Sequence, residues 1–206
     1  MMDEEKNPLS IIKPDKPTTG PTNRPVRVLG IDLGTTNSTV SEIKWDPSMP
    51  TVPPARVLEI AQPTKEGAWT HSLVPSVVAL HNGQVIVGEG AKRLRADSAD
   101  LGLDRNRDIF YECKNEIGIK KTYHRAPEGY RSAAEIGGHV VDFMVKAALA
   151  DDPTPIDRIV VTVPASFQVA QRHDTVLAMR LAGLEVAGGD LIDEPVAAFL
   201  DYLTTG

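Results

Sequence analysis

One short run of β-branched residues constrains the fold more than any other feature of the chain. Residues 159–163 read Ile-Val-Val-Thr-Val, which is typical of a buried strand, and Pro164 ends the run. Helical patterns flank this strand, because apolar residues recur at three- and four-residue steps over 132–150 and a second helix is predicted over 170–182. A final helix is expected to start near Pro195. Strands that alternate with helices in this way predict an α/β domain.

The first part of the chain predicts antiparallel strands. Strands are expected at 26–31 and 38–43, joined by a short turn that contains glycine, and this arrangement indicates a hairpin. A third strand is expected at 56–60, and the His-Asn-Gly sequence at 81–83 predicts a second hairpin. A short helix is expected at 91–96. Together the two parts predict a mixed β-sheet flanked by helices.

Composition and charge exclude several classes of function. The 206 residues carry 22 Lys and Arg against 28 Asp and Glu, a net charge of 22 − 28 = −6, which argues against nucleic acid as a partner. No stretch reaches the roughly 18 consecutive apolar residues of a membrane span, so no membrane partner is expected. The single cysteine, Cys113, allows no intrachain disulfide and is interpreted as a small core residue.

The N-terminal residues 1–25 differ from the rest of the chain. They combine repeated prolines with charged and polar residues, which predicts a flexible tail. A short recognition motif around Ile11 is the alternative. The segment has no apolar stretch of the kind that secretory signals contain, so a cytoplasmic protein is expected.

The turn between the first two strands has the chemistry of a phosphate site. Gly34 lets the backbone bend sharply, and the hydroxyls of Thr35, Thr36 and Ser38 stand beside main-chain N–H groups that suit phosphate oxygens. Asp32, at the end of a buried strand, is placed to hold water around Mg²⁺. The alternative is an ordinary polar hairpin. The turn is not a Walker A loop, because no Gly-Lys-Ser/Thr follows it.

Four other residues are candidates for chemistry. Lys114 lies close to an apolar Phe-Tyr pair at 110–111 and could hold a phosphate in a cleft, although most lysines only extend to solvent. Glu194 opens the last helix and could orient water near a bound metal–nucleotide, or it could simply face the helix dipole. Pro164 and Arg172 could be a turn residue and a solvated charge and no more.

Taken in order, these segments resemble the 70-kilodalton heat-shock chaperones, the DnaK family. The resemblance runs from about Val26 to Leu203 and keeps the order and similar spacing of the family's segments. It rests on residues 30–38 (Gly-Ile-Asp-Leu-Gly-Thr-Thr-Asn-Ser), 87–93, 110–118, 161–167 with 170–172, 182–186 and 193–198.

The resemblance implies a fold and a domain organisation. The fold would be one lobe of an actin-like, ribonuclease H-like ATPase domain, with a mixed sheet flanked by helices. Residues 26–75 and 131–206 would form the core subdomain, and 76–130 would form a small, trimmed upper subdomain. The 118–130 stretch is shorter than in the family.

The resemblance also implies roles for individual residues. Gly34, Thr35, Thr36 and Asn37 would contact the phosphates of ATP or ADP, and Asp32 would sit near Mg²⁺ through water. Lys114 would reach toward the γ-phosphate and the attacking water, which Glu194 would help to orient. Pro164 and Arg172 match a proline switch and its relay arginine, which couple nucleotide state to a substrate domain. ATP would be hydrolysed by positioning and charge stabilisation, without a covalent enzyme intermediate.

The implied partners are a second lobe, a peptide-binding domain, unfolded client proteins and co-chaperones. The sequence departs from the family because it stops at Gly206, before the second phosphate motif and the adenosine motif, and because Asn115-Glu116 replaces a basic–apolar pair after the lysine. We therefore expect a fragment, either excised or a truncated gene product, that binds ATP weakly and hydrolyses almost none, since half a cleft buries little of a ligand. A sugar-kinase-type phosphotransferase and a non-catalytic interaction module that keeps the fold are the alternatives.

Overall fold

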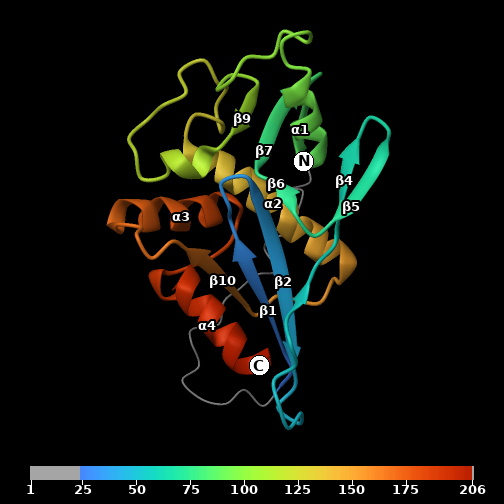
Figure 1. Ribbon diagram of the computed structural model, residues 1–206, viewed down its shortest axis with the longest axis vertical. Helices are drawn as coiled ribbons and strands as arrows, with labels where there is room; N and C mark the ends of the chain where they lie inside the picture. Colours follow the sequence, from blue (N-terminus) through green and yellow to red (C-terminus); the bar gives the residue numbers. More distant parts are fainter. Residues whose placement is uncertain (1–23, 206) are drawn as a thin grey trace, which may run out of the picture.

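The computed structural model describes residues 24–205, which form a mixed sheet covered by helices (Figure 1). The main sheet has the strand order β11-β10-β1-β2-β3, with a short strand β6 paired to β2. β1, β10 and β11 run parallel, whereas β2 is antiparallel to β1 and β3. The mixed sheet predicted from the sequence is therefore confirmed. Its strands are β1 (Val26–Asp32), β2 (Asn37–Trp45), β3 (Arg56–Val57), β6 (Val74–Pro75), β10 (Arg158–Val163) and β11 (Leu191–Asp193).

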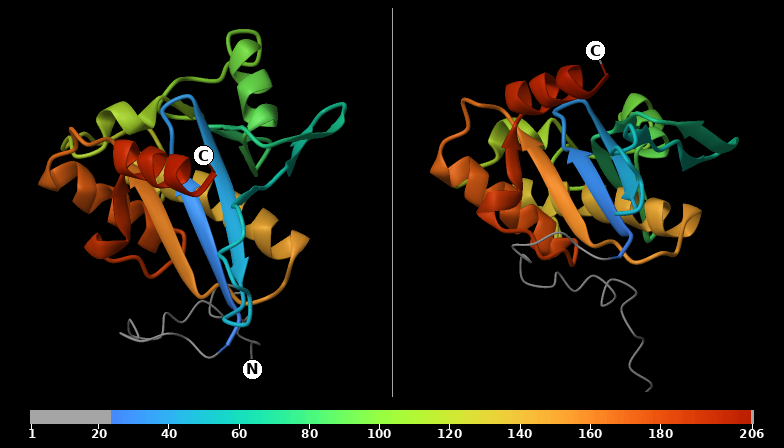
Figure 2. Two further views of the ribbon diagram at one scale, coloured as in Figure 1. Left: turned by 60° about the horizontal axis from the view of Figure 1, so that its bottom comes forward. Right: turned by 90° about the horizontal axis from the view of Figure 1, so that it is seen from below.

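Helices lie on both faces of the main sheet. α2 (Ala133–Asp151) and α3 (Val169–Leu181) pack against each other on one face, and α4 (Glu194–Thr205) lies on the other (Figure 2). The alternation in burial along β1 fits this arrangement, since Arg27, Leu29 and Ile31 are buried while the positions between them are half-buried. The helices predicted on either side of the buried strand are confirmed.

A buried arginine joins the start of β1 to the end of α2. Arg27 is 1% exposed, and its Nε donates to the Oε2 atom of Glu42 at 2.9 Å. Its terminal nitrogens donate to the carbonyls of Ala148, Asp152 and Thr154, at and just beyond the end of α2. The side chain therefore pairs with a carboxylate and joins the start of β1 to the end of the helix.

A second, smaller sheet stands beside the main one, in the order β8-β7-β9. The hairpin predicted at 81–83 joins β7 to β8, and Asn82 and Gly83 adopt φ angles of 52° and 71°, as such a tight turn requires. The predicted short helix is also present, as α1. The elements of this region are β7 (Val77–His81), β8 (Gln84–Val87), α1 (Glu89–Ala96), β9 (Ile109–Tyr111) and the 3-10 helix η2 (Cys113–Glu116).

The single strand predicted at 56–60 is wrong. The chain forms β3 and then β4 (Ile60–Thr64), and β4 pairs with β5 (Gly67–His71) as a separate two-stranded arm. Between them the buried Leu58 still donates its N–H to the carbonyl of Val40 in β2 at 2.9 Å, and the chain leaves the edge of the main sheet only after this residue.

Two further sequence predictions concern the N-terminal tail and membrane-spanning segments. The flexible tail predicted at 1–25 falls almost entirely on residues 1–23, which lie outside the described residues. Among residues 24–205, no helix combines the length and the apolar character that crossing a lipid bilayer requires.

Candidate functional site

The turn after β1 needs glycine at position 34. A Cβ atom there would lie 2.0 Å from the carbonyl oxygen of Asn37, so any side chain would force the backbone apart. Thr35 is half-buried, and Thr36 and Asn37 are exposed. Within residues 24–205 these three side chains make no hydrogen bond. The turn therefore presents hydroxyl, amide and main-chain groups to a ligand.

Ser76 holds this turn in place, although sequence reasoning did not single it out. Its hydroxyl donates to the carbonyl of Gly34 at 2.8 Å and lies 2.8 Å from the hydroxyl of Ser38. Its main-chain N–H donates to the carbonyl of Thr36 at 2.9 Å. Ser76 directly follows β6, which pairs with β2, so the partner of the turn comes from a segment distant in sequence.

Asp32 ends β1 beside Thr162 of β10, its partner in the parallel register. The Thr162 hydroxyl donates to Oδ1 of Asp32 at 3.0 Å and fixes the orientation of the carboxylate. No group of three or more acidic, His or Cys side chains among the described residues could hold a metal alone. A single fixed carboxylate nevertheless suits Mg²⁺, which commonly keeps several waters and takes further ligands from phosphate.

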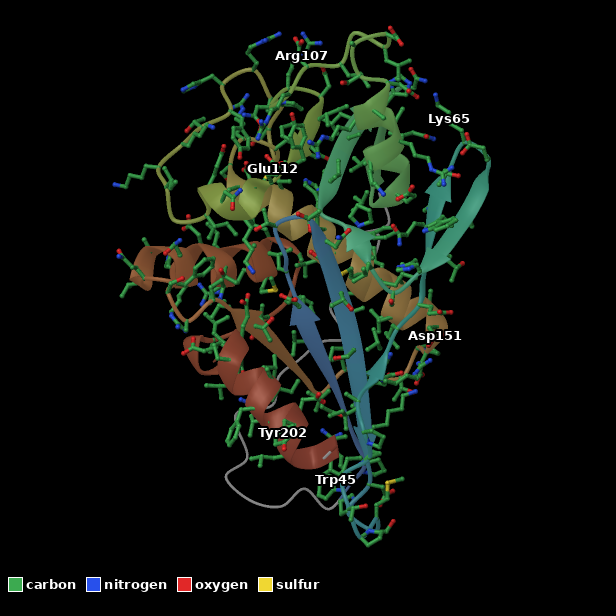
Figure 3. The ribbon with its side chains drawn as sticks, viewed as in Figure 1. Trp45, Lys65, Arg107, Glu112, Asp151 and Tyr202 are labelled. Atoms are coloured by element: carbon green, nitrogen blue, oxygen red, sulfur yellow. The ribbon has the colours of Figure 1, made fainter. Side chains whose placement is uncertain are left out.

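Lys114 lies in η2, which the chain enters through a sharp bend at Glu112, labelled in Figure 3. Glu112 has a φ of 60°, a left-handed conformation that is uncommon outside glycine. The Lys114 side chain is 12% exposed, and its ammonium lies 3.0 Å from Oε1 of Glu194 and 5.8 Å from the centre of the Phe167 ring. Lys114 also lines a small cavity together with Gly34 and Ser76. The structure thus brings the predicted lysine, glutamate and turn together.

Cys113, beside Lys114, is buried as predicted. Burial raises the pKa of its thiol to about 11. The group is therefore neutral near pH 7 and supplies no charge beside the lysine.

Pro164 and Arg172 are joined through a third residue. The Phe167 N–H donates to the carbonyl of Pro164 at 2.9 Å, and the Arg172 Nε donates to the carbonyl of Phe167 at 3.1 Å. Arg172 also forms an ion pair with Asp193, the last residue of β11. The guanidinium therefore connects the turn after β10 with the end of the neighbouring strand.

Strand direction explains why these groups meet. β1, β10 and β11 are parallel, so their carboxyl ends lie at one edge of the sheet, where ligands bind in open α/β sheets. Asp32, Pro164 and Glu194 stand at or just after these three ends. A donor-rich turn, carboxylates and the Lys114 ammonium at this edge suit an anionic ligand that carries a divalent metal.

Sequence reasoning missed further positions that support the site. The N–H of Gly118 donates to Oδ2 of Asp174 at 3.0 Å, and its φ of +80° and close contact with Gln171 leave no room for a side chain. This contact seats the segment after Lys114 on α3. The only sequence signal for this contact was Gly118 itself, a glycine in a stretch whose secondary structure the sequence does not reveal.

Comparison with known proteins shows which family this chain resembles. A family model described as Hsp70 protein matches residues 106–204. The chaperone protein DnaK of Metamycoplasma hominis is 37% identical over 175 residues, which cover 85% of this chain and 25% of that protein. The DnaK proteins of Mycoplasmopsis synoviae and Mesomycoplasma hyopneumoniae are 36% and 35% identical, again over 85% of this chain and 25% of each relative. The chain thus spans about a quarter of the length of these relatives.

Proposed function

Because this chain belongs to the Hsp70 family, we propose that it forms the nucleotide-binding first lobe of an ATPase that couples ATP hydrolysis to protein folding or remodelling. The observation that carries the proposal is the meeting of the glycine turn with Lys114 and Glu194 at one edge of the sheet. We also propose the division into a core subdomain, 26–75 with 131–206, and an upper subdomain, 76–130. The small sheet β8-β7-β9, separate from the main sheet, supports this division.

The residues of the turn would bind the phosphates of ATP or ADP. Gly34 allows the close backbone approach, and the N–H groups and side chains of Thr35, Thr36 and Asn37 would donate to phosphate oxygens. Asp32, oriented by Thr162, would hold water of a Mg²⁺ ion. When bound, Mg²⁺ would neutralise part of the charge that develops on the phosphates.

Lys114 and Glu194 would act on the transferred phosphate and the attacking water. The ammonium ion would turn from Glu194 toward the γ-phosphate and stabilise its charge. Glu194, 43% exposed, would then accept a hydrogen bond from the attacking water and orient it. No covalent enzyme intermediate is needed.

The links beyond the site are also proposals. Pro164 and Arg172, connected through Phe167, would pass the nucleotide state to a substrate domain. A second lobe, a peptide-binding domain, unfolded client proteins and co-chaperones would be the partners, in the cytoplasm. Neither nucleic acid nor membrane is among the partners that we propose.

An NMR titration of the ¹⁵N-labelled chain with MgATP tests the proposal, because it detects binding as weak as a millimolar Kd. We expect shifts that centre on residues 32–38, 76 and 114, and we expect the Gly34→Val variant to lose them. No binding at several millimolar MgATP would favour a non-catalytic interaction module. Robust ATP turnover that Lys114→Ala abolishes would contradict the expectation that this lobe by itself hydrolyses almost none.

A further inference from the structure

Asp193 is a charged residue of the site that has no role in the proposal above. It ends β11 and directly precedes Glu194, and its carboxylate forms an ion pair with the guanidinium of Arg172. The two side chains are 35% and 32% exposed, so the pair is only partly screened by solvent.

The same guanidinium holds a second segment. While one terminal nitrogen of Arg172 contacts Asp193, its Nε donates to the carbonyl of Phe167 at 3.1 Å. Arg172 thus ties the end of β11 to the turn that follows β10. A planar guanidinium is suited to this, because its donors point in fixed directions.

These two segments supply the surroundings of the lysine. Glu194, next to Asp193, lies 3.0 Å from the Lys114 ammonium, and the Phe167 ring lies 5.8 Å from it. Arg172 therefore holds Phe167, whose ring faces Lys114, and Asp193, whose neighbour Glu194 pairs with Lys114. Removing the Asp193 carboxylate would leave Arg172 free to attract Glu194 and so compete with Lys114 for it.

We propose that Asp193 is a positioning residue that, through Arg172, fixes Glu194 and Phe167 around the Lys114 ammonium. The inference rests on the proposed nucleotide site, in which Lys114 addresses the γ-phosphate. Its consequence is confined to ATP: Asp193 affects the phosphate that Lys114 contacts and leaves the contacts of ADP unchanged.

Asp193→Asn tests this, and Asp190→Asn is a matched control. Asp190 forms a comparable ion pair with Arg158 at 2.8 Å, at the opposite end of β11 from the site. We expect Asp193→Asn to strengthen MgATP binding about fivefold, because Arg172 then competes for Glu194 and frees the Lys114 ammonium for the γ-phosphate, while MgADP binding and both affinities of Asp190→Asn stay unchanged. In the Lys114→Ala background, Asp193→Asn should have no further effect on ATP binding. Unchanged or weaker ATP binding, or an equal change for ATP and ADP, would overturn the proposal, since a merely structural role would act on both nucleotides.

A second measurement needs no nucleotide. The acetylation rate of each lysine is followed by mass spectrometry, with exposed Lys146, far from the site in sequence, as the internal reference. We expect acetylation of Lys114 to become about threefold faster in Asp193→Asn and to stay unchanged in Asp190→Asn. An unchanged acetylation rate of Lys114 in Asp193→Asn would overturn the inference, even if the chain binds no nucleotide. A faster acetylation rate in a chain that binds no nucleotide would contradict only the proposed function.

Discussion

The Lys114 ammonium lies 3.0 Å from Oε1 of Glu194, although the two residues are 80 positions apart in the chain. One comes from η2, beside the small sheet, and the other from the first turn of α4, at the edge of the main sheet. The contact therefore spans two parts of the molecule that carry different pieces of the proposed site. An anionic ligand that attracts Lys114 would have to separate this pair.

Replacing Lys114 should reduce binding of ATP more than binding of ADP. Lys114→Ala removes a charge-assisted contact with the γ-phosphate, worth about tenfold in Kd. Lys121→Ala is the control, because Lys121 forms an exposed ion pair with Glu116. Parallel titrations with MgATP and MgADP give the ratio of the two Kd values for each variant. If this ratio in Lys114→Ala stays at the wild-type value, Lys114 does not contact the third phosphate.

Gly34→Ala should abolish phosphate binding without unfolding the chain. The added Cβ would lie 2.0 Å from the Asn37 carbonyl oxygen, so the turn must open and misplace its donors, at a cost of about 1–3 kcal/mol in the free energy of unfolding. Gly189→Ala is the matched control, since no heavy atom lies within 4 Å of a Cβ there. Urea denaturation and MgATP titration check both effects. Wild-type affinity in Gly34→Ala would contradict the assignment of this turn.

Ser76→Ala should destabilise the fold and loosen the turn. It leaves the carbonyl of Gly34 and the hydroxyl of Ser38 without their buried partner, which costs about 1–3 kcal/mol. Ser41→Ala serves as the comparison, because its hydroxyl makes only a 3.5 Å contact with the carbonyl of Gly30. Denaturation curves of the two variants should therefore differ clearly, and equal midpoints would show that Ser76 does not support the turn.

Ser76 also illustrates what the sequence could not reveal. The turn itself was predictable, because Gly34 and its hydroxyl neighbours follow a buried strand directly. Ser76 follows 42 positions after Gly34, and its hydroxyl gives no local signal of a long-range partner. Local chemistry in a turn is encoded locally, whereas the side chain that supports it depends on how β6 pairs with β2.

The strands show the same division. The alternation in β1 and the β-branched run in β10 identify both, because each has a face that must be buried. β5 is exposed at all five positions, so it has no hydrophobic periodicity, and the arm it forms with β4 went unpredicted. Lys114 and Glu194 were predicted as candidates one by one, but their direct contact depends on how η2 and the small sheet pack against α2.

Stability should depend on pH through the buried carboxylate of Glu42, which is 3% exposed. Burial alone would raise its pKa, but hydrogen bonds from Arg56 and Arg27 and the positive charges of Arg27 and Lys44 hold the pKa below the ordinary value of about 4.5. The folded state then binds the proton less tightly than the unfolded state. The stabilisation is therefore complete above about pH 4.5 and is lost as the pH falls through the lower folded pKa.

Glu42→Gln isolates this contribution. It leaves Arg27 buried without its counter-ion, so at pH 7 we expect a loss of about 3–5 kcal/mol in the free energy of unfolding. Because the unpaired variant has no titrating group here, the difference from wild type should shrink as the pH falls below about 4.5. Urea denaturation between pH 7 and pH 3.5 measures the difference, and Asp142→Asn, which breaks an exposed pair with Lys146, should track the wild type. A difference that stays constant with pH would mean that Glu42 is not held ionised by its arginine partners.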